Sequence, residues 1–170
     1  MDASRRERGG RLRMKIKGAI DEDFVNYRKP SAFVAFPKCS FKCDRECGRR
    51  ICQNSRLAKE PDVDVPASEI VRHMKESTLS EAIVCGGLEP LDSFDDLMEL
   101  LREFRKESDG DFVIYTGYRK EEIPDEIKSL AEYPNVIMKF GRYRPGDKPH
   151  LDPVLGVTLA SDGQHAEKIS

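Results

Sequence analysis

The 170-residue sequence lacks a long apolar run and lacks a strong excess of charge of either sign. A helix needs about 18 mainly apolar residues to cross a bilayer, and no stretch of the sequence approaches that length. No charged-then-apolar signal segment opens the chain, so we expect a cytoplasmic protein with no membrane partner. The formal net charge of -2 provides no overall basic field, which argues against a nucleic-acid partner.

The length of the chain suits one domain and is too short for two independent apolar cores. We therefore expect a single domain over residues 1–170. Basic residues crowd the start of the chain, and we interpret residues 1–13 as a solvated basic arm that leads into the first strand. Contact of this arm with a phosphate or an acidic partner is the alternative. The cations of the first seventeen residues are Arg5, Arg6, Arg8, Arg11, Arg13, Lys15 and Lys17.

Short runs of β-branched and other apolar residues predict five strands. These runs are residues 11–20, 32–36, 82–85, 112–115 and 136–140. Three stretches between them have helical spacing. The first begins at Pro66 and extends to residue 74. The second covers residues 93–107, where Ser93 and Asp96 resemble a capping box. The third begins near Glu121 and extends to residue 133.

Strands that alternate with helices predict an α/β fold with a mainly parallel, curved sheet. Ligands bind such sheets at the carboxyl ends of the strands, so the loops that begin at Pro37, Gly86 and Thr116 should share one face. From Gly141 onward the pattern fades, and we expect an irregular C-terminal tail over residues 141–170.

Four of the five cysteines lie in one loop, at Cys39, Cys43, Cys47 and Cys52. An odd count with this crowding favours a metal or redox site over a disulfide framework. Thiolates commonly hold iron-sulfur clusters, and a cluster held by only three of them leaves one iron open to a substrate. A four-cysteine zinc-stabilised binding module is the alternative, although structural zinc sites usually use two separated short-spaced pairs. Cys85 stands apart, and we expect it to be buried in a strand.

A second motif, Gly86-Gly87-Leu88-Glu89-Pro90, follows the predicted strand at residues 82–85. Two glycines let a backbone approach a ligand closely, and the carboxylate can accept a hydrogen bond from an ammonium group. Alone, the pattern is weak because Gly-Gly turns are common where strands end. Thr116 and Gly117 end another predicted strand, where they either line a ligand pocket or simply turn the chain.

Together these motifs resemble those of the radical S-adenosylmethionine (SAM) superfamily. Cys39-x3-Cys43 matches the first half of its Cys-x3-Cys-x2-Cys motif, and Cys52-Gln53-Asn54 is similar to its ending in small glycyl-radical activating proteins. The spacing departs from the family, since eight residues separate Cys43 from Cys52 in place of two. The resemblance implies Cys39, Cys43 and Cys52 as cluster ligands, with Cys47 as the alternative third ligand.

The glycine motif resembles the family's Gly-Gly-Glu motif, which binds the methionyl amino group of SAM, here with Leu88 interposed. The resemblance implies that SAM contacts lie in three loops. The implied residues are Asn54, Gly86, Gly87, Glu89, Thr116 and Gly117. No side chain is implied as an acid, base or nucleophile beyond the cluster and SAM.

Residues 23–27, 113–118 and 150–156 look like segments of the proteins that activate anaerobic ribonucleoside-triphosphate reductase. That resemblance implies a partial (β/α) barrel of the radical SAM type, with a 4Fe-4S cluster and SAM as cofactors. It implies a glycyl-radical enzyme as target and a reductant protein such as flavodoxin or ferredoxin as partner. A radical SAM enzyme that acts on a small molecule or a peptide is the alternative.

Overall fold

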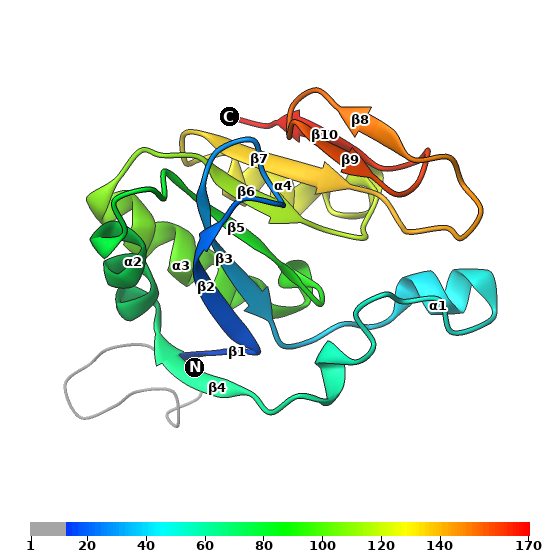
Figure 1. The fold of residues 1–170 in the computed structure, drawn as a ribbon, viewed down its shortest axis with the longest axis horizontal. Helices are drawn as coiled ribbons and strands as arrows, with labels where there is room; N and C mark the ends of the chain where they lie inside the picture. Colours follow the sequence, from blue (N-terminus) through cyan, green and yellow to red (C-terminus); the bar gives the residue numbers. More distant parts are fainter. Residues whose placement is uncertain (1–12) are drawn as a thin grey trace.

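The computed structural model describes residues 13–170, so most of the predicted basic arm lies outside the described part of the chain. A six-stranded sheet forms the centre, in the order β10-β7-β6-β5-β3-β2 (Figure 1). Its strands are β2 (Gly18–Asp23), β3 (Ser31–Phe36), β5 (Ala82–Gly87), β6 (Phe112–Tyr115), β7 (Val136–Phe140) and β10 (His165–Lys168). The inner four are parallel, and the edge strands β2 and β10 are antiparallel to their neighbours. The fold is therefore mixed α/β with a mainly parallel sheet, and this sheet does not close into a barrel.

Three helices connect the parallel strands and share one face of the sheet. They are α2 (Ala67–Glu76), α3 (Phe94–Glu107) and α4 (Pro124–Leu130). Alternate strand residues, such as Val34, Ile83 and Ile114, join the apolar sides of these helices in one buried core. Because side chains alternate along a strand, this face takes every second residue of each parallel strand. The predicted strands and helices of this region are confirmed, and Cys85 is fully buried within β5.

The opposite face of the sheet is covered by the loop before β3 and by the C-terminal segment (Figure 1). There, the strands β8 (His150–Asp152) and β9 (Val157–Leu159) form a hairpin, and β10 pairs with β7. The predicted irregular tail over residues 141–170 was therefore wrong. Buried Asp152 organises this segment by accepting hydrogen bonds from the backbone N–H groups of Val154, Leu155 and Ala166. Strands this short carry no periodic signal in the sequence.

The predicted strand at residues 11–20 is divided into two within the described residues. β1 (Arg13–Ile16) pairs with β4 (Val63–Pro66), which was not predicted, and β2 joins the main sheet. Lys17 lies at the break, where its ammonium contacts Asp62 at 2.8 Å, and its side chain is largely buried. Lys17 is therefore structural and does not belong to a solvated arm.

The helix starts differ from the predicted ones. Ser93 precedes α3 but makes no capping hydrogen bond, so the predicted capping box is wrong. The chain instead enters through the short 3-10 helix η3 (Pro90–Ser93), which Glu89 caps by accepting from the N–H of Leu91. The third helix is shorter than predicted, and the 3-10 helix η4 (Lys120–Glu122) precedes it. No helix in residues 13–170 is long and apolar enough to span a membrane.

Candidate metal centre

The loops after β3, β5 and β6 meet at the carboxyl end of the parallel sheet, as the sequence predicted. We refer to residues 37–59 as the cysteine loop and to residues 86–92 as the glycine loop. The N–H of Glu89 donates to the carbonyl of Lys38 at 2.7 Å, which joins these two loops. Asp92 accepts from the N–H of Ser40 at 2.8 Å and from the hydroxyl of Tyr118 at 2.6 Å. Three segments that are distant in sequence therefore form one hydrogen-bonded site.

The carboxylate of Glu89 lies at the centre of this site and is only 2% exposed. It accepts hydrogen bonds from the N–H of Gly117 at 2.8 Å and the N–H of Leu91 at 3.1 Å. The ammonium of Lys42, which is also buried, lies 3.3 Å from the same carboxylate and 3.7 Å from the centroid of the Tyr118 ring. A buried carboxylate needs such partners, because removal of its charge from water is costly. Lys42 was not among the predicted site residues, although its place between Cys39 and Cys43 was a usable signal.

The two glycines of the glycine loop are required by strand packing. Gly87 has a φ of +82°, and a Cβ there would lie 2.8 Å from the Cα of Ala35 on β3. A Cβ on Gly86 would lie 3.1 Å from the ring of Phe33. The side chain of Asn54 donates to the carbonyl of Gly87 at 2.8 Å, so the end of the cysteine motif reaches the glycine loop.

The first two cysteines flank a left-handed turn. Phe41 has a φ of +52°, and its N–H donates to the sulfur of Cys39 at 3.2 Å. The short helix α1 (Lys42–Cys47) begins at the next residue. A Cβ placed on Gly117 would lie 3.7 Å from the sulfur of Cys43, so Cys43 faces the loop after β6. Cys39 and Cys43 are both half-buried.

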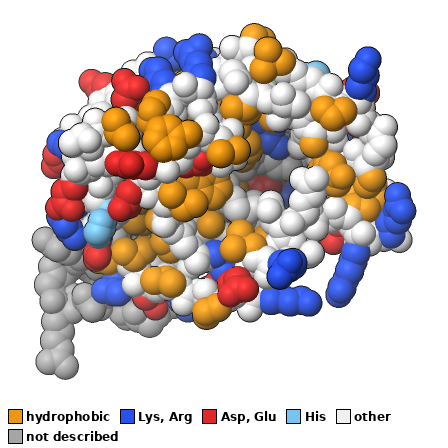
Figure 2. All heavy atoms as spheres, in the orientation of Figure 1, with side chains coloured by type: hydrophobic (Ala, Val, Ile, Leu, Met, Phe, Trp, Pro, Cys, Tyr) orange, Lys and Arg blue, Asp and Glu red, His pale blue; other side chains and the backbone are white. Residues whose placement is uncertain are grey.

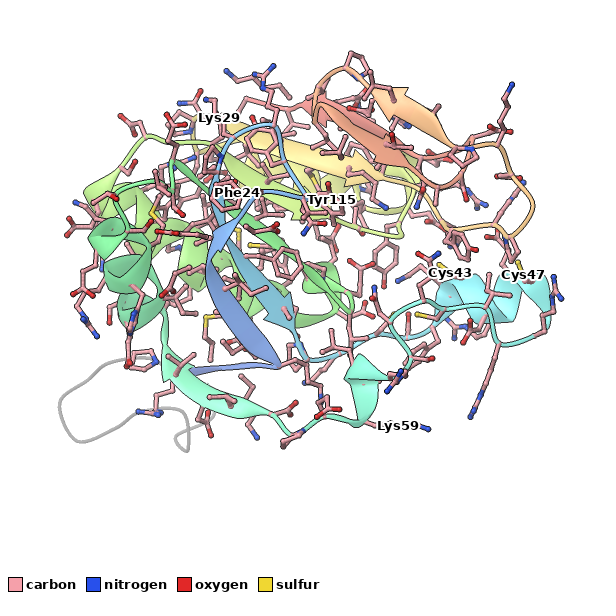
Figure 3. The ribbon with its side chains drawn as sticks, viewed as in Figure 1. Phe24, Lys29, Cys43, Cys47, Lys59 and Tyr115 are labelled. Carbon is pink, nitrogen blue, oxygen red and sulfur yellow. The ribbon has the colours of Figure 1, made fainter. Side chains whose placement is uncertain are left out.

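Two hydrogen bonds that the sequence does not reveal hold the segment of Cys52 against the start of α1. The Oδ1 of Asp44 accepts from the N–H groups of Ile51 and Cys52, both at 2.8 Å. Cys52 is half-buried, and burial is the main cause that raises the pKa of its thiol, with Asp44 and Cys43 adding to the rise. Cys47 is exposed at the outer end of α1, whereas Cys43 lies at its inner end (Figure 3).

The cysteines are donors of the type that iron-sulfur clusters use, but they are not gathered around one metal position in this structure. Within residues 13–170, no three His, Cys, Asp or Glu side chains are gathered closely enough to hold a metal ion. Burial raises the pKa of the Cys39 thiol as well as that of Cys52. These two thiols are therefore protonated at neutral pH without metal, and they have to lose protons when they become ligands.

Residues 29–151 match the family model described as the 4Fe-4S single cluster domain. The chain belongs to this family. The matched segment contains the whole cysteine loop, the glycine loop and Gly117. No curated protein and no solved structure matches the chain. A domain that binds a 4Fe-4S cluster is thus indicated, in preference to the zinc-stabilised alternative.

Thr116 and Gly117 differ in how they face the centre of this 4Fe-4S domain. The hydroxyl of buried Thr116 accepts from the N–H of Tyr118 at 3.0 Å, so it serves the turn. The N–H of Gly117 points to Glu89, as described above. Of the two, only Gly117 presents a hydrogen-bonding group to the site.

A second buried lysine borders the same centre. Lys139 on β7 donates to the carbonyl of Gly141 at 3.2 Å. Burial lowers its pKa to about 8, while the neighbouring charges of Glu89 and Cys43 act in the opposite direction. Lys139 was not among the predicted site residues, although a lysine within the apolar run 136–140 was a visible signal.

A network of charges fixes α1 of the 4Fe-4S domain to the neighbouring loops. Glu46 on α1 pairs with Arg119 and with Arg142, at 3.2 Å from the Nε of the latter. Arg142 also binds Glu122 in a bidentate pair at 2.8 and 2.9 Å. This pairing is the main cause that lowers the pKa of Glu122 to about 2. The segments after β6 and β7 thus hold the helix that carries Cys43.

Proposed function

We propose that this chain is a radical SAM enzyme in which Cys39, Cys43 and Cys52 hold the 4Fe-4S cluster. The observation that carries the proposal is the buried Glu89 carboxylate, which lies against the cysteine loop and already accepts a primary ammonium, that of Lys42. A carboxylate in this place would accept a hydrogen bond from the amino group of SAM, and a cluster held by three cysteines would leave one iron open to SAM.

The residues of the chain bind and orient, whereas the cofactors supply the chemistry. A 4Fe-4S cluster held by Cys39, Cys43 and Cys52 would supply the electron for the reductive cleavage of SAM. In the proposed complex, Glu89 would accept a hydrogen bond from the amino group of SAM, and Lys42 would move aside or share the carboxylate. The absent side chain of Gly117 leaves room beside Glu89, and Asn54 holds the cysteine loop against the glycine loop. Gly86 and Gly87 would contact SAM through their backbone, because their side-chain positions face β3.

The open, mainly parallel sheet, with its site at the carboxyl ends of the strands, supports the proposal, because a partial barrel is expected of this enzyme type. On the resemblance of three sequence segments, we infer that the target is a glycine of an anaerobic ribonucleoside-triphosphate reductase. A hydrogen atom of this glycine would be transferred to form 5'-deoxyadenosine, which would leave the radical on the glycine. Figure 2 shows a recess on this face of the molecule, with charged atoms on its floor. A segment of a partner protein would have access to such a recess.

The test is anaerobic reconstitution with iron and sulfide, followed by reduction in the presence of SAM and detection of 5'-deoxyadenosine by mass spectrometry. We expect 5'-deoxyadenosine from the native chain. We also expect Glu89→Gln to keep the cluster absorbance but lose most of the product. Stoichiometric zinc in the purified protein, with no product after reconstitution, would contradict the proposal.

Two matched variants test the ligand assignment. We expect Cys52→Ser to lose the cluster and Cys47→Ser to retain it, as measured by iron content and visible absorbance. The reverse result would assign Cys47 as the third ligand. Addition of an anaerobic ribonucleotide reductase then tests the target, because transfer to glycine produces a glycyl-radical signal in electron paramagnetic resonance. Product without that signal would direct the search to a small molecule or a peptide.

A further inference from the structure

The buried carboxylate of Glu89 has one partner that a ligand can replace. Its Oε1 caps η3 by accepting from the N–H of Leu91 at 3.1 Å. Its Oε2 accepts from the N–H of Gly117 at 2.8 Å and from the ammonium of Lys42 at 3.3 Å. A carboxylate oxygen offers about two lone pairs, so both positions on Oε2 are filled. Of these three donors, two belong to the backbone, and only Lys42 can leave by rotation of a side chain.

Lys42 also fills the space beside this carboxylate. A Cβ placed on Gly117 would lie 3.5 Å from the Oε2 of Glu89 and 3.8 Å from the Cδ of Lys42. The ammonium lies 3.7 Å from the centroid of the Tyr118 ring, and the side chain of Lys42 is only 6% exposed. The room that the missing side chain of Gly117 leaves near Glu89 is therefore bordered by the aliphatic part of Lys42.

The contact between Lys42 and Glu89 is longer than a tight ion pair. Hydrogen bonds between an ammonium and a carboxylate are typically about 2.7–2.9 Å long, whereas this one is 3.3 Å. Removal of the cation alone from a buried pair is costly, because it leaves the other charge unpaired. A ligand that brings its own ammonium to Glu89 avoids this cost, because it restores the pairing that it breaks.

A displaced Lys42 has a second carboxylate close to hand. The ring of Tyr118 faces the ammonium of Lys42, and the hydroxyl of the same tyrosine donates to Asp92 at 2.6 Å. Asp92 is half-buried, and its other oxygen accepts from the N–H of Ser40 at 2.8 Å. Each of its oxygens has more than one lone pair, so Asp92 can accept a further donor at the hydroxyl end of Tyr118.

We propose that Lys42 is an internal competitor that sets the affinity of this site for every ligand with an ammonium group. The proposal rests on the proposed function, in which Glu89 binds the amino group of SAM. Because Lys42 has to be displaced, each such ligand loses affinity by the same factor. A free amine or amino acid, which has few other contacts, then fails to occupy the site. A ligand that is also held through its nucleoside still binds.

The experiment measures ligand binding to the reconstituted full chain with its cluster oxidised, so that SAM is not cleaved. Equilibrium dialysis gives the dissociation constants of SAM, S-adenosylhomocysteine and methylthioadenosine. The last two have no net charge, and only S-adenosylhomocysteine has an amino group, so their comparison isolates the ammonium from general charge effects. Lys42→Met removes the competitor. Lys59→Met is the control, because Lys59 lies in the same loop, is exposed and points away from the molecule (Figure 3).

Lys42→Gln is a second variant, because loss of Lys42 destabilises the chain and the amide still donates to Glu89. Circular dichroism and iron content establish that each variant is folded and loaded. Where Lys42→Met is not folded, Lys42→Gln decides the outcome.

We expect Lys42→Met to bind S-adenosylhomocysteine about tenfold more tightly than the native chain, as for a site that its own side chain leaves free about a tenth of the time. Lys42→Gln should show a smaller gain in the same direction. Methylthioadenosine should bind all four proteins equally, and Lys59→Met should match the native chain with every ligand. Unchanged or weaker binding of S-adenosylhomocysteine by the folded Lys42 variants would overturn the proposal. An equal gain for methylthioadenosine would also overturn it, because that gain does not involve an ammonium.

Two outcomes separate this inference from its basis. If the native chain binds SAM and forms 5'-deoxyadenosine while the Lys42 variants gain no affinity, the competition is wrong and the proposed function stands. If none of the four proteins binds SAM, the proposed function fails and the inference fails with it.

Discussion

Replacement of Asp44 by Ala should open the segment that returns Cys52 to the start of α1. The carboxylate accepts from two backbone N–H groups, those of Ile51 and Cys52, both at 2.8 Å. Hydrogen bonds to a charged acceptor contribute about 1.5–3 kcal/mol each, and the lower end applies to a partly exposed site. For the two bonds together, we therefore expect Asp44→Ala to lower the free energy of unfolding of the iron-free protein by about 3 kcal/mol.

The same change should weaken cluster retention if Cys52 is a ligand. A loss of about 3 kcal/mol in loop closure corresponds to an affinity for the cluster that is up to about 150-fold weaker. Asp44→Asn is the matched control, because the amide keeps one acceptor oxygen in nearly the same place. We expect Asp44→Asn to lose less than half of the unfolding free energy that Asp44→Ala loses relative to the native chain.

The assays are urea unfolding of the reduced, iron-free protein and anaerobic iron content after gel filtration of the reconstituted protein. If Asp44→Ala and Asp44→Asn both match the native chain in iron content, loop closure by Asp44 does not position a ligand. A large loss of stability without a loss of iron would show that Asp44 supports the fold alone, with the third ligand elsewhere.

Three other predictions concern packing and charge. Gly87→Ala should lower the free energy of unfolding by at least about 2 kcal/mol, because residue 87 has a positive φ and its Cβ would meet the backbone of β3. Gly18→Ala is the control. It should change the free energy of unfolding by less than about 0.5 kcal/mol, because the space at its Cβ position is open. Lys42→Met should destabilise the iron-free protein by about 3 kcal/mol, because it leaves the buried Glu89 carboxylate without its ammonium partner. Lys42→Met/Glu89→Leu should recover most of that loss in a double-mutant cycle, and additive losses would refute direct pairing. The pKa of Glu122 is lowered from 4.5 to about 2, so its stabilisation is present above pH 4.5 and is lost as the pH falls toward 2. In urea unfolding, the free energy of unfolding should therefore fall less between pH 7 and 3 for Glu122→Gln than for the native chain. An equal fall for the two proteins would refute the pairing.

The sequence by itself determined the parts of this protein that depend on local pattern. Alternation of apolar runs with amphipathic stretches predicted β3, β5, β6 and β7 and the helices between them, because strand and helix periods are properties of neighbouring residues. The rule that ligands bind at the carboxyl ends of parallel strands then placed the cysteine and glycine loops together, as the bond from Glu89 to Lys38 confirms. The assignment of Cys39, Cys43 and Cys52 as ligands stays a prediction.

Only the tertiary structure decided which side chains complete the site. The pairing of Lys42 with Glu89 joins residues 47 positions apart, and no periodic signal encodes such a contact. Two other features also depend on a single carboxylate that accepts from backbone N–H groups. Half-buried Asp44 returns Cys52 to α1, and buried Asp152 organises the strands of residues 150–168. A buried charge takes whichever donors the fold brings within reach, so its partners are known only once the chain has closed around it.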